Sequence, residues 1–179
     1  LTSGIAWLGV SRVIIQGYTL VLMVYVANLL VPADYALMGV AMIVIGLLDL
    51  ITEFGLGDVL VQKDEVTQND IANVFWMSSL FGLFVSSIAL TSSNYIEEFF
   101  NKSGVSEIIK VLSVVLIIKS LYIVPYKLIE RNMYFKKKAV IDVLAKVISI
   151  SAAGIMAFIG LGVWALVYSQ ITYSVIVGI

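Results

Sequence analysis

Apolar residues fill six long stretches of this chain, and short polar segments separate them. A helix of about 20 apolar residues is long enough to cross the hydrocarbon core of a bilayer. Each stretch reaches or approaches that length, so the pattern predicts an all-α, polytopic bundle of six transmembrane helices with no soluble domain. The predicted helices cover residues 4–30, 35–61, 71–90, 108–124, 139–159 and 163–179.

The polar breaks predict how these helices begin and end. Pro32 lies in a tight turn after the first stretch, and Asp34 is expected to cap the second helix. Pro125 is expected to mark the end of the fourth helix, because proline cannot donate to the backbone hydrogen-bond ladder. Residues 95–100 combine two glutamates with aromatic residues, which is typical of a short amphipathic helix lying on the membrane surface.

Lysine and arginine gather at one end of the predicted helices. Alternation of the spans places six of them in the loops on one side and one in the loops on the other. Cytoplasmic loops are enriched in these residues, so the basic side and the N-terminus are predicted to be cytoplasmic. Residues 131–138 are the densest basic segment, and we expect them to fix the topology and touch anionic headgroups rather than bind nucleic acid.

Composition supports the membrane class and excludes several chemistries. Hydrophobic residues make up 61% of the chain and charged residues 13%, whereas soluble domains average about 45–50% and about 25%. Cysteine and histidine are absent, which excludes disulfides, thiolate chemistry and the commonest metal ligand. No phosphate-binding loop or nucleophile elbow occurs, so we predict no catalytic residue, cofactor or metal.

The two ends of the chain suggest that it is part of something larger. It begins at Leu1 rather than at methionine, and it stops at Ile179 inside an apolar run. We expect it to be the front portion of a longer membrane protein.

Charged side chains inside apolar spans are candidates for function, because an ion near the bilayer centre costs roughly 2.5–3.5 kcal/mol. Arg12, Gln16 and Thr19 share one face of the first helix at i, i+4, i+7 spacing. They are expected to line a water-filled cavity and bind substrate, with the guanidinium facing phosphate or carboxylate oxygens. Lys119 is expected to add positive charge to the same cavity. Alternatively, Arg12 and Lys119 extend to the membrane interface.

Two further groups of charged residues that include carboxylates lie on other predicted helices. Asp49 and Glu53 are one turn apart on the second helix, and we expect them to couple transport to a proton or cation or to accept sugar hydroxyls. Alternatively they are solvated at the cytoplasmic end of that helix or pair with Arg12. In the fifth span, Asp142 and Lys146 are expected to form an intrahelical ion pair.

Several short segments, in their order and spacing, carry a resemblance to a known family. They are Arg12 with Gln16, residues 29–35 (LLVPADY), 54–57 (FGLG), 61–62 (VQ), 73–76 (NVFW), 125, 128–136 (LIERNMYFK) and 160–166 (GLGVWAL). Together they resemble the Wzx-type polysaccharide exporters. These are lipid-linked oligosaccharide flippases of the multidrug/oligosaccharidyl-lipid/polysaccharide (MOP) exporter superfamily.

The resemblance implies two six-helix lobes around a central cavity, with residues 1–179 forming the N-terminal lobe and the C-terminal lobe lying outside this chain. It implies alternating access that moves an undecaprenyl-pyrophosphate-linked oligosaccharide across the bacterial cytoplasmic (inner) membrane, for O-antigen (lipopolysaccharide), capsule or exopolysaccharide assembly. Implied partners are this lipid-linked oligosaccharide, membrane lipids, and polysaccharide polymerase and chain-length proteins. Arg12 matches the family's cationic cavity positions best. Glu130 departs from the family, where related exporters often have another basic residue.

Three rival functions stay open on the residues alone. A drug/cation antiporter of the same superfamily would need an acid-dominated cavity, which Arg12 disfavours. A membrane enzyme of polysaccharide assembly is disfavoured by the absence of histidine and of a large outward loop. A purely structural membrane subunit is disfavoured by charge inside the spans, unless those charges pair with one another.

Overall fold

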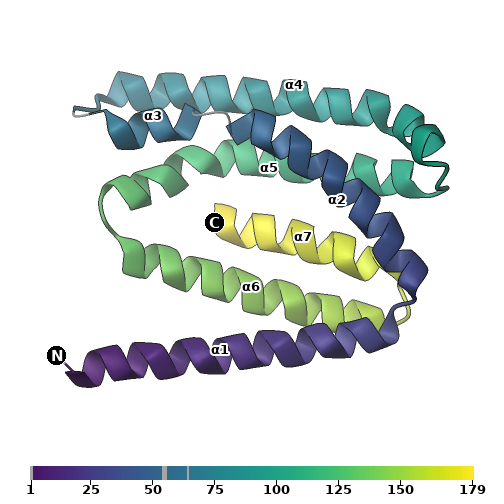
Figure 1. The fold of residues 1–179 in the computed structure, drawn as a ribbon. Helices are drawn as coiled ribbons and strands as arrows, with labels where there is room; N and C mark the ends of the chain where they lie inside the picture. The colour runs from purple at the N-terminus through teal and green to yellow at the C-terminus, as the bar shows by residue number, and fades with distance from the viewer. Residues whose placement is uncertain (1, 54–55, 64) are drawn as a thin grey trace.

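The computed structural model describes residues 2–53, 56–63 and 65–179, and for residues 2–15, 53 and 56 it describes the backbone alone. Throughout this part of the chain the regular elements are α-helices, so the predicted all-α class is confirmed (Figure 1). The helices are α1 (Thr2–Leu29), α2 (Pro32–Glu53), α3 (Leu56–Gln62), α4 (Gln68–Phe100), α5 (Val105–Arg131), α6 (Phe135–Phe158) and α7 (Val163–Gly178).

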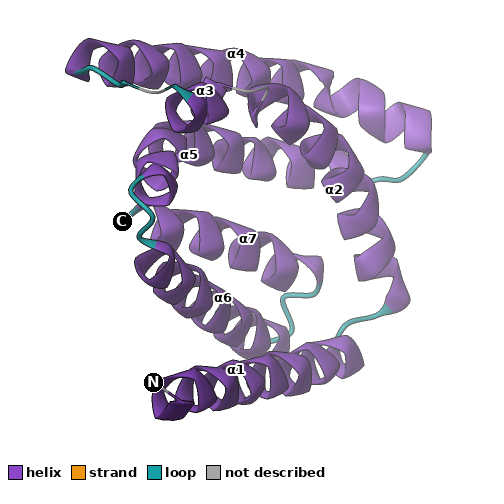
Figure 2. Ribbon diagram, turned by 60° about the vertical axis from the view of Figure 1, so that its left-hand side comes forward, coloured by secondary structure: helices purple, strands orange, loops and turns teal. Residues whose placement is uncertain are grey.

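The helices form a curved layer (Figure 2), and α5 packs against α2, α3, α4, α6 and α7. The neighbours along the layer are α1, α6, α7, α5 and α4, in that order, and α2 packs against α4, α5 and α7. The short helix α3 lies against α4 and α5 at one end of the bundle. Helix α1 therefore reaches the rest of the bundle mainly through α6.

Large apolar side chains cover the outside of the bundle, as expected for a multi-pass membrane protein. Val21, Leu50, Leu80 and Ile155, from four different helices, are each 63–66% exposed. Helices α4, α5 and α6 and nearly all of α2 are long and apolar enough to cross a membrane. Helix α7 and Gln16–Leu29, the part of α1 whose side chains are described, are shorter apolar segments. The count of six spans therefore stays a prediction for the first and last helices.

The second predicted helix, over residues 35–61, corresponds to two described helices, and the residues between them lie outside the described part of the chain. Helix α2 ends at Glu53 and a separate helix, α3, begins at Leu56. Helix α3 packs against α4 and α5 at one end of the bundle.

Helix α4 is longer than predicted, and the separate interfacial helix over residues 95–100 was wrong. The helix continues through residues 91–94 to Phe100 and ends at Asn101, which has a left-handed backbone with φ of 49°. The hydroxyl groups of Thr91 and Ser92 donate to backbone carbonyls one turn back. The polar residues that suggested a break are thus satisfied within the helix.

Pro125 does not end its helix, contrary to the prediction. Helix α5 continues through it to Arg131, although an interior proline costs about 3 kcal/mol. The Arg131 guanidinium donates to the backbone carbonyl of Leu60 at 2.6 Å and to that of Lys63, which ties the end of α5 to the end of α3. These tertiary contacts stabilise the part of α5 that follows Pro125.

The turn between α1 and α2 follows the prediction in outline. Pro32 is the first residue of α2, where its missing N–H leaves no intrahelical hydrogen bond unmade. Asp34 accepts a hydrogen bond from the backbone N–H of Val31 at 3.2 Å. Asp34 therefore caps α2 from within its first turn.

Helices α4 and α5 pack along a seam of small side chains. Serines recur every seven residues on both helices, and each is at most 6% exposed. The six seam serines are Ser79, Ser86 and Ser93 on α4, and Ser106, Ser113 and Ser120 on α5. Seven-residue spacing keeps one helix face toward its partner, and small residues let the backbones approach closely. Across the seam the Ser86 hydroxyl donates to the Ser113 carbonyl at 2.9 Å.

Gly82 occupies the tightest point of the seam. A Cβ atom built at this position would overlap the side chain of Ser120 and lie 3.4 Å from the carbonyl oxygen of Leu116. The helices can approach this closely because residue 82 has no side chain.

We expect Gly82→Ala to destabilise the protein by about 1–3 kcal/mol, because the added methyl group overpacks the seam. The measurement is the apparent melting temperature of the purified protein in detergent. Gly39→Ala is the matched control, since a Cβ there meets nothing within 4 Å and alanine favours the helix. Adding Ser120→Gly to Gly82→Ala should restore the melting temperature, and a Gly82→Ala variant as stable as Gly39→Ala would contradict the role of the seam.

Candidate functional site

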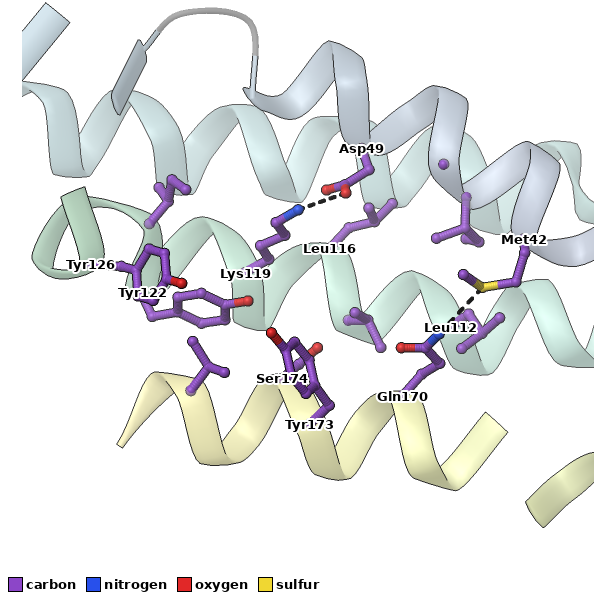
Figure 3. Close-up of a pocket in the computed structure, with 15 residues that line it drawn as sticks. Met42, Asp49, Leu112, Leu116, Lys119, Tyr122, Tyr126, Gln170, Tyr173 and Ser174 are labelled. Carbon is purple, nitrogen blue, oxygen red and sulfur yellow. Dashed lines mark hydrogen bonds and ion pairs between the residues drawn. The ribbon is translucent and has the colours of Figure 1, made fainter. Parts of the chain in front are cut away.

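A pocket of about 310 Å³ lies between α2, α5 and α7 (Figure 3). Apolar residues such as Ile45, Leu112 and Leu116 form much of its wall. Its polar lining comes from all three helices: Asp49, Lys119, Tyr122, Tyr126, Gln170, Tyr173 and Ser174. An apolar cavity with a few converging polar groups is the usual form of a small-ligand site.

Lys119 and Asp49 point toward one another at the pocket wall and join α5 to α2 (Figure 3). The Lys119 Nζ lies 2.6 Å from Asp49 Oδ2, and the two side chains are 22% and 28% exposed. The ammonium group of Lys119 is therefore held by a carboxylate of the neighbouring helix. Two opposite charges in a medium of low polarity hold each other strongly, although the cost of dehydrating them cancels much of the gain in stability.

The second carboxylate oxygen of Asp49 has no partner comparable to Lys119. Its Oδ1 atom is buried and has no hydrogen-bond partner in the described part of the structure. A buried acceptor without a donor costs about 1–3 kcal/mol. A proton, a cation or a ligand hydroxyl at this oxygen would remove that cost, so the site has unused binding capacity.

Three tyrosines give the pocket an aromatic side. Tyr122 and Tyr126 of α5 meet edge to face, with ring centroids 6.2 Å apart, and Tyr173 faces them from α7 (Figure 3). The Tyr126 hydroxyl donates to both carboxylate oxygens of Asp142, at 2.7 and 2.9 Å. The ammonium group of Lys138 lies 4.7 Å from the centre of the Tyr126 ring. Contacts with α6 thus fix the orientation of Tyr126.

These contacts correct the expected pairing of Asp142. Within the described residues its partner is Tyr126 on α5, and no ion pair joins it to Lys146 on its own helix. Lys146 is exposed. Sequence spacing favours the intrahelical pair, but the approach of α5 to α6 supplies a hydroxyl donor instead.

The structure brings together only some of the predicted site residues. Lys119, assigned to substrate, and Asp49, assigned to ion coupling, are direct partners in one pocket. Gln16 is exposed and Thr19 is buried on α1, and neither lines this pocket, because α1 packs on α6 rather than on α2, α5 or α7. The side chains of Arg12 and Glu53 lie outside the described residues, so their assigned roles stay predictions.

Sequence reasoning missed the polar residues of α7. Gln170, Tyr173 and Ser174 share one face of the helix at i, i+3, i+4 spacing, and the Gln170 amide lies 3.8 Å from the Met42 sulfur. The signal was a glutamine within the last apolar stretch, where an amide needs a partner inside the protein. In the part of the chain that is described, no three carboxylates gather as a metal site would require.

We expect a double-mutant cycle of Lys119→Gln and Asp49→Asn to give a coupling energy of about 1–3 kcal/mol, because the pair is removed from water on most of its surface. The readout is the thermal stability of the four proteins in detergent. The Lys127–Asp58 pair, 2.6 Å apart at the end of the bundle with Asp58 52% exposed, is the control and should couple by less than about 1 kcal/mol. Equal coupling in both cycles would mean that water screens the charge of Asp49 as fully as that of Asp58, although Asp49 is less exposed.

A family model described as "Polysaccharide biosynthesis protein" matches residues 25–179. The chain is similar to the lipopolysaccharide biosynthesis protein WzxC of Escherichia coli K12, with 24% identity over 80% of this chain and 29% of the relative. It is similar to the succinoglycan biosynthesis transport protein ExoT of Rhizobium meliloti 1021, with 23% identity over 98% and 35%.

A third relative is the teichuronic acid biosynthesis protein TuaB of Bacillus subtilis 168, with 20% identity over 94% of this chain and 35% of the relative. The chain thus spans about a third of the length of the curated relatives that it matches. No solved structure matches the chain.

Proposed function

This chain belongs to the polysaccharide biosynthesis protein family, and from that premise we propose that it forms the N-terminal lobe of a flippase that carries a lipid-linked oligosaccharide across the bacterial cytoplasmic membrane. Because the chain spans about a third of its curated relatives, the proposal includes a second lobe outside residues 1–179. One relative is named a transport protein, which supports transport rather than catalysis.

The observation that carries the proposal is Lys119, a cation within a membrane span that lines a pocket with tyrosine, glutamine and serine side chains. An ammonium group suits the phosphate oxygens of a carrier such as undecaprenyl pyrophosphate. Hydroxyl and amide groups suit sugar hydroxyls, and aromatic rings suit the apolar faces of sugars. The described lining holds one cation and one carboxylate, which offers no support for the acid-dominated cavity of a drug/cation antiporter.

The ion pair suggests how substrate and ion are coupled. A phosphate that takes the ammonium group of Lys119 leaves Asp49 without its partner and with both carboxylate oxygens available. Asp49 would then take up a proton or a cation, since an unpaired carboxylate in a medium of low polarity is costly. Glu53 lies one turn away on the same face of α2 and would share this ion-coupling role.

The residues of α1 complete the proposed substrate site from the other side of the layer. Arg12 would hold a second phosphate, and Gln16 and Thr19 would contact sugars. These contacts require a rearrangement or a second lobe, because α1 is separated from the pocket by α6 and α7. Rocking of the two lobes, as in alternating access, would supply it.

Orientation follows from the basic residues at one end of the bundle. The end that holds the α5–α6 turn carries Arg131, Lys136, Lys137 and Lys138, and we place it in the cytoplasm together with the N-terminus. The glycan would then enter from the cytoplasm and leave on the outer side, where polymerase and chain-length proteins would receive it.

The test is leaflet transfer of undecaprenyl-pyrophosphate-linked oligosaccharide by the full-length protein in liposomes. We expect the double variant Lys119→Gln/Asp49→Asn to transfer about 10- to 100-fold more slowly than the wild type, the range expected for losing a charged hydrogen-bond partner of the substrate. The double variant removes both charges of the pair together, so no unpaired charge is left in the pocket to cause a folding defect.

Two further variants sharpen this test. Lys102→Gln removes an exposed lysine from the turn between α4 and α5, at the opposite end of the bundle, and should transfer at the wild-type rate. Arg12→Gln tests the α1 contribution separately. If the double variant transferred glycan at the wild-type rate, Lys119 would not be part of the substrate site. If the wild type did not transfer its own glycan, the proposed flippase function would be overturned.

A further inference from the structure

The turn between α5 and α6 holds an exposed group of apolar and aromatic side chains at one end of the bundle. Met133 has a left-handed backbone, with φ of 58°, and backbone hydrogen bonds from residues 132–134 to the last turn of α5 hold the reversal. Met133, Tyr134 and Phe135 are 75%, 60% and 54% exposed. Exposure of such a group to water is unfavourable, so a membrane or a partner is expected to cover it.

The four cations of this segment divide into two kinds. Arg131 is held by the carbonyl groups at the end of α3, and Lys138 lies 2.9 Å from Glu130 and over the Tyr126 ring. Lys136 and Lys137 are exposed, and neither has a hydrogen bond or ion pair in the described part of the chain. Two unpaired positive charges therefore stand side by side next to the aromatic residues.

A groove on α6 connects these charges to an apolar stripe. Its lining is Met133, Tyr134, Lys136, Lys137, Val140 and Ile141. Below it, Leu144 and Ile148 continue the face of Val140 at i, i+4 spacing, and these three side chains are 47–52% exposed. Lys136 is one turn above Val140 on the same face. The stripe therefore runs about 18 Å from Lys136 to Ile148, with a cationic head and an apolar tail about 12 Å long.

The position of α6 in the membrane fits this polarity. The helix has 24 residues, whereas about 20 cross the hydrocarbon core. Its far end, Phe158 and Ile159, is apolar and exposed. The surplus length is therefore at the near end, which places Lys136 and Lys137 at the level of the headgroups and Val140 at the top of the acyl chains.

We propose that the groove formed by Met133, Tyr134, Lys136, Lys137, Val140 and Ile141 binds one anionic phospholipid of the bilayer, with the phosphate at the two lysines and an acyl chain along Val140, Leu144 and Ile148. Charge complementarity selects the anionic headgroup, and the apolar stripe selects a lipid over a soluble phosphate. This site lies outside the pocket of Lys119 and does not depend on the transported substrate.

The experiment is a titration of the full-length protein, stripped of lipid in detergent, with dioleoyl phosphatidylglycerol, scored by native mass spectrometry. A lysine near an anionic lipid contributes about a factor of five in affinity, so Lys136→Gln/Lys137→Gln should bind about 25-fold more weakly than the wild type. The matched control is Lys102→Gln/Lys110→Gln, which removes the same charge at the opposite end of the bundle and should change binding less than 2-fold. Both variants alter exposed side chains, and the hydrogen bond from Lys110 to Asn94 that the control changes is itself exposed, so both proteins should fold normally.

Three comparisons decide the identity of the ligand. Dioleoyl phosphatidylcholine should bind no more tightly to the wild type than to the Lys136→Gln/Lys137→Gln variant, since it offers no net negative charge. Leu144→Asn should weaken phosphatidylglycerol binding several-fold if an acyl chain follows the stripe. Equal binding by wild type and the double lysine variant would overturn the proposal. Displacement of phosphatidylglycerol by an equal concentration of undecaprenyl phosphate would assign the groove to the carrier lipid and overturn it as well.

Discussion

The close approach of α4 and α5 along the serine seam determines where the other parts of the site lie. Ser120 faces α4 at the tightest point, beside Gly82. Lys119 is the preceding residue, so the helical rotation of about 100° per residue turns it away from α4 and toward α2. Because α5 also contacts α3, α6 and α7, a shift of this helix would move the ion pair, the tyrosines and the end of the bundle together.

The polar groups inside the bundle follow one rule: a membrane offers no water, so each group needs a partner within the protein. The seam serines bond to backbone carbonyls or to one another, Tyr126 satisfies Asp142, and Lys119 satisfies one oxygen of Asp49. Among the described residues, two buried side-chain oxygens lack a partner, Ser78 Oγ and Asp49 Oδ1, and of these two residues Asp49 lines the pocket. This unpaired oxygen does not stabilise the fold, and its position in the pocket is therefore a reason to place ligand or ion binding there.

The basic end of the bundle serves two purposes that the structure separates. Arg131 and Lys138 hold α3, α5 and α6 together through carbonyl, carboxylate and aromatic partners. Lys136 and Lys137 make no such contacts among the described residues, and both are exposed beside exposed aromatic residues. The sequence alone predicts one topology signal in this basic segment. The structure shows that two of its cations join helices, whereas the other two belong to an exposed surface suited to anionic lipid.

The sequence by itself determined the all-α membrane class, the family and the basic end, because hydropathy, segment order and charge counts are properties of the chain. It also singled out Lys119 and Asp49 as charges that a membrane span would hold only for a reason. It did not pair them, since they are 70 residues apart, and it grouped Gln16 and Thr19 with Lys119, whose pocket neither of them lines. Only the tertiary structure decided that α5 continues through Pro125, that Tyr126 rather than Lys146 satisfies Asp142, and that α7 contributes Gln170 and Tyr173. The physical reason is the same in each case: local spacing ranks the partners on one helix, and the packing of different helices in a medium without water selects among partners that are distant in sequence.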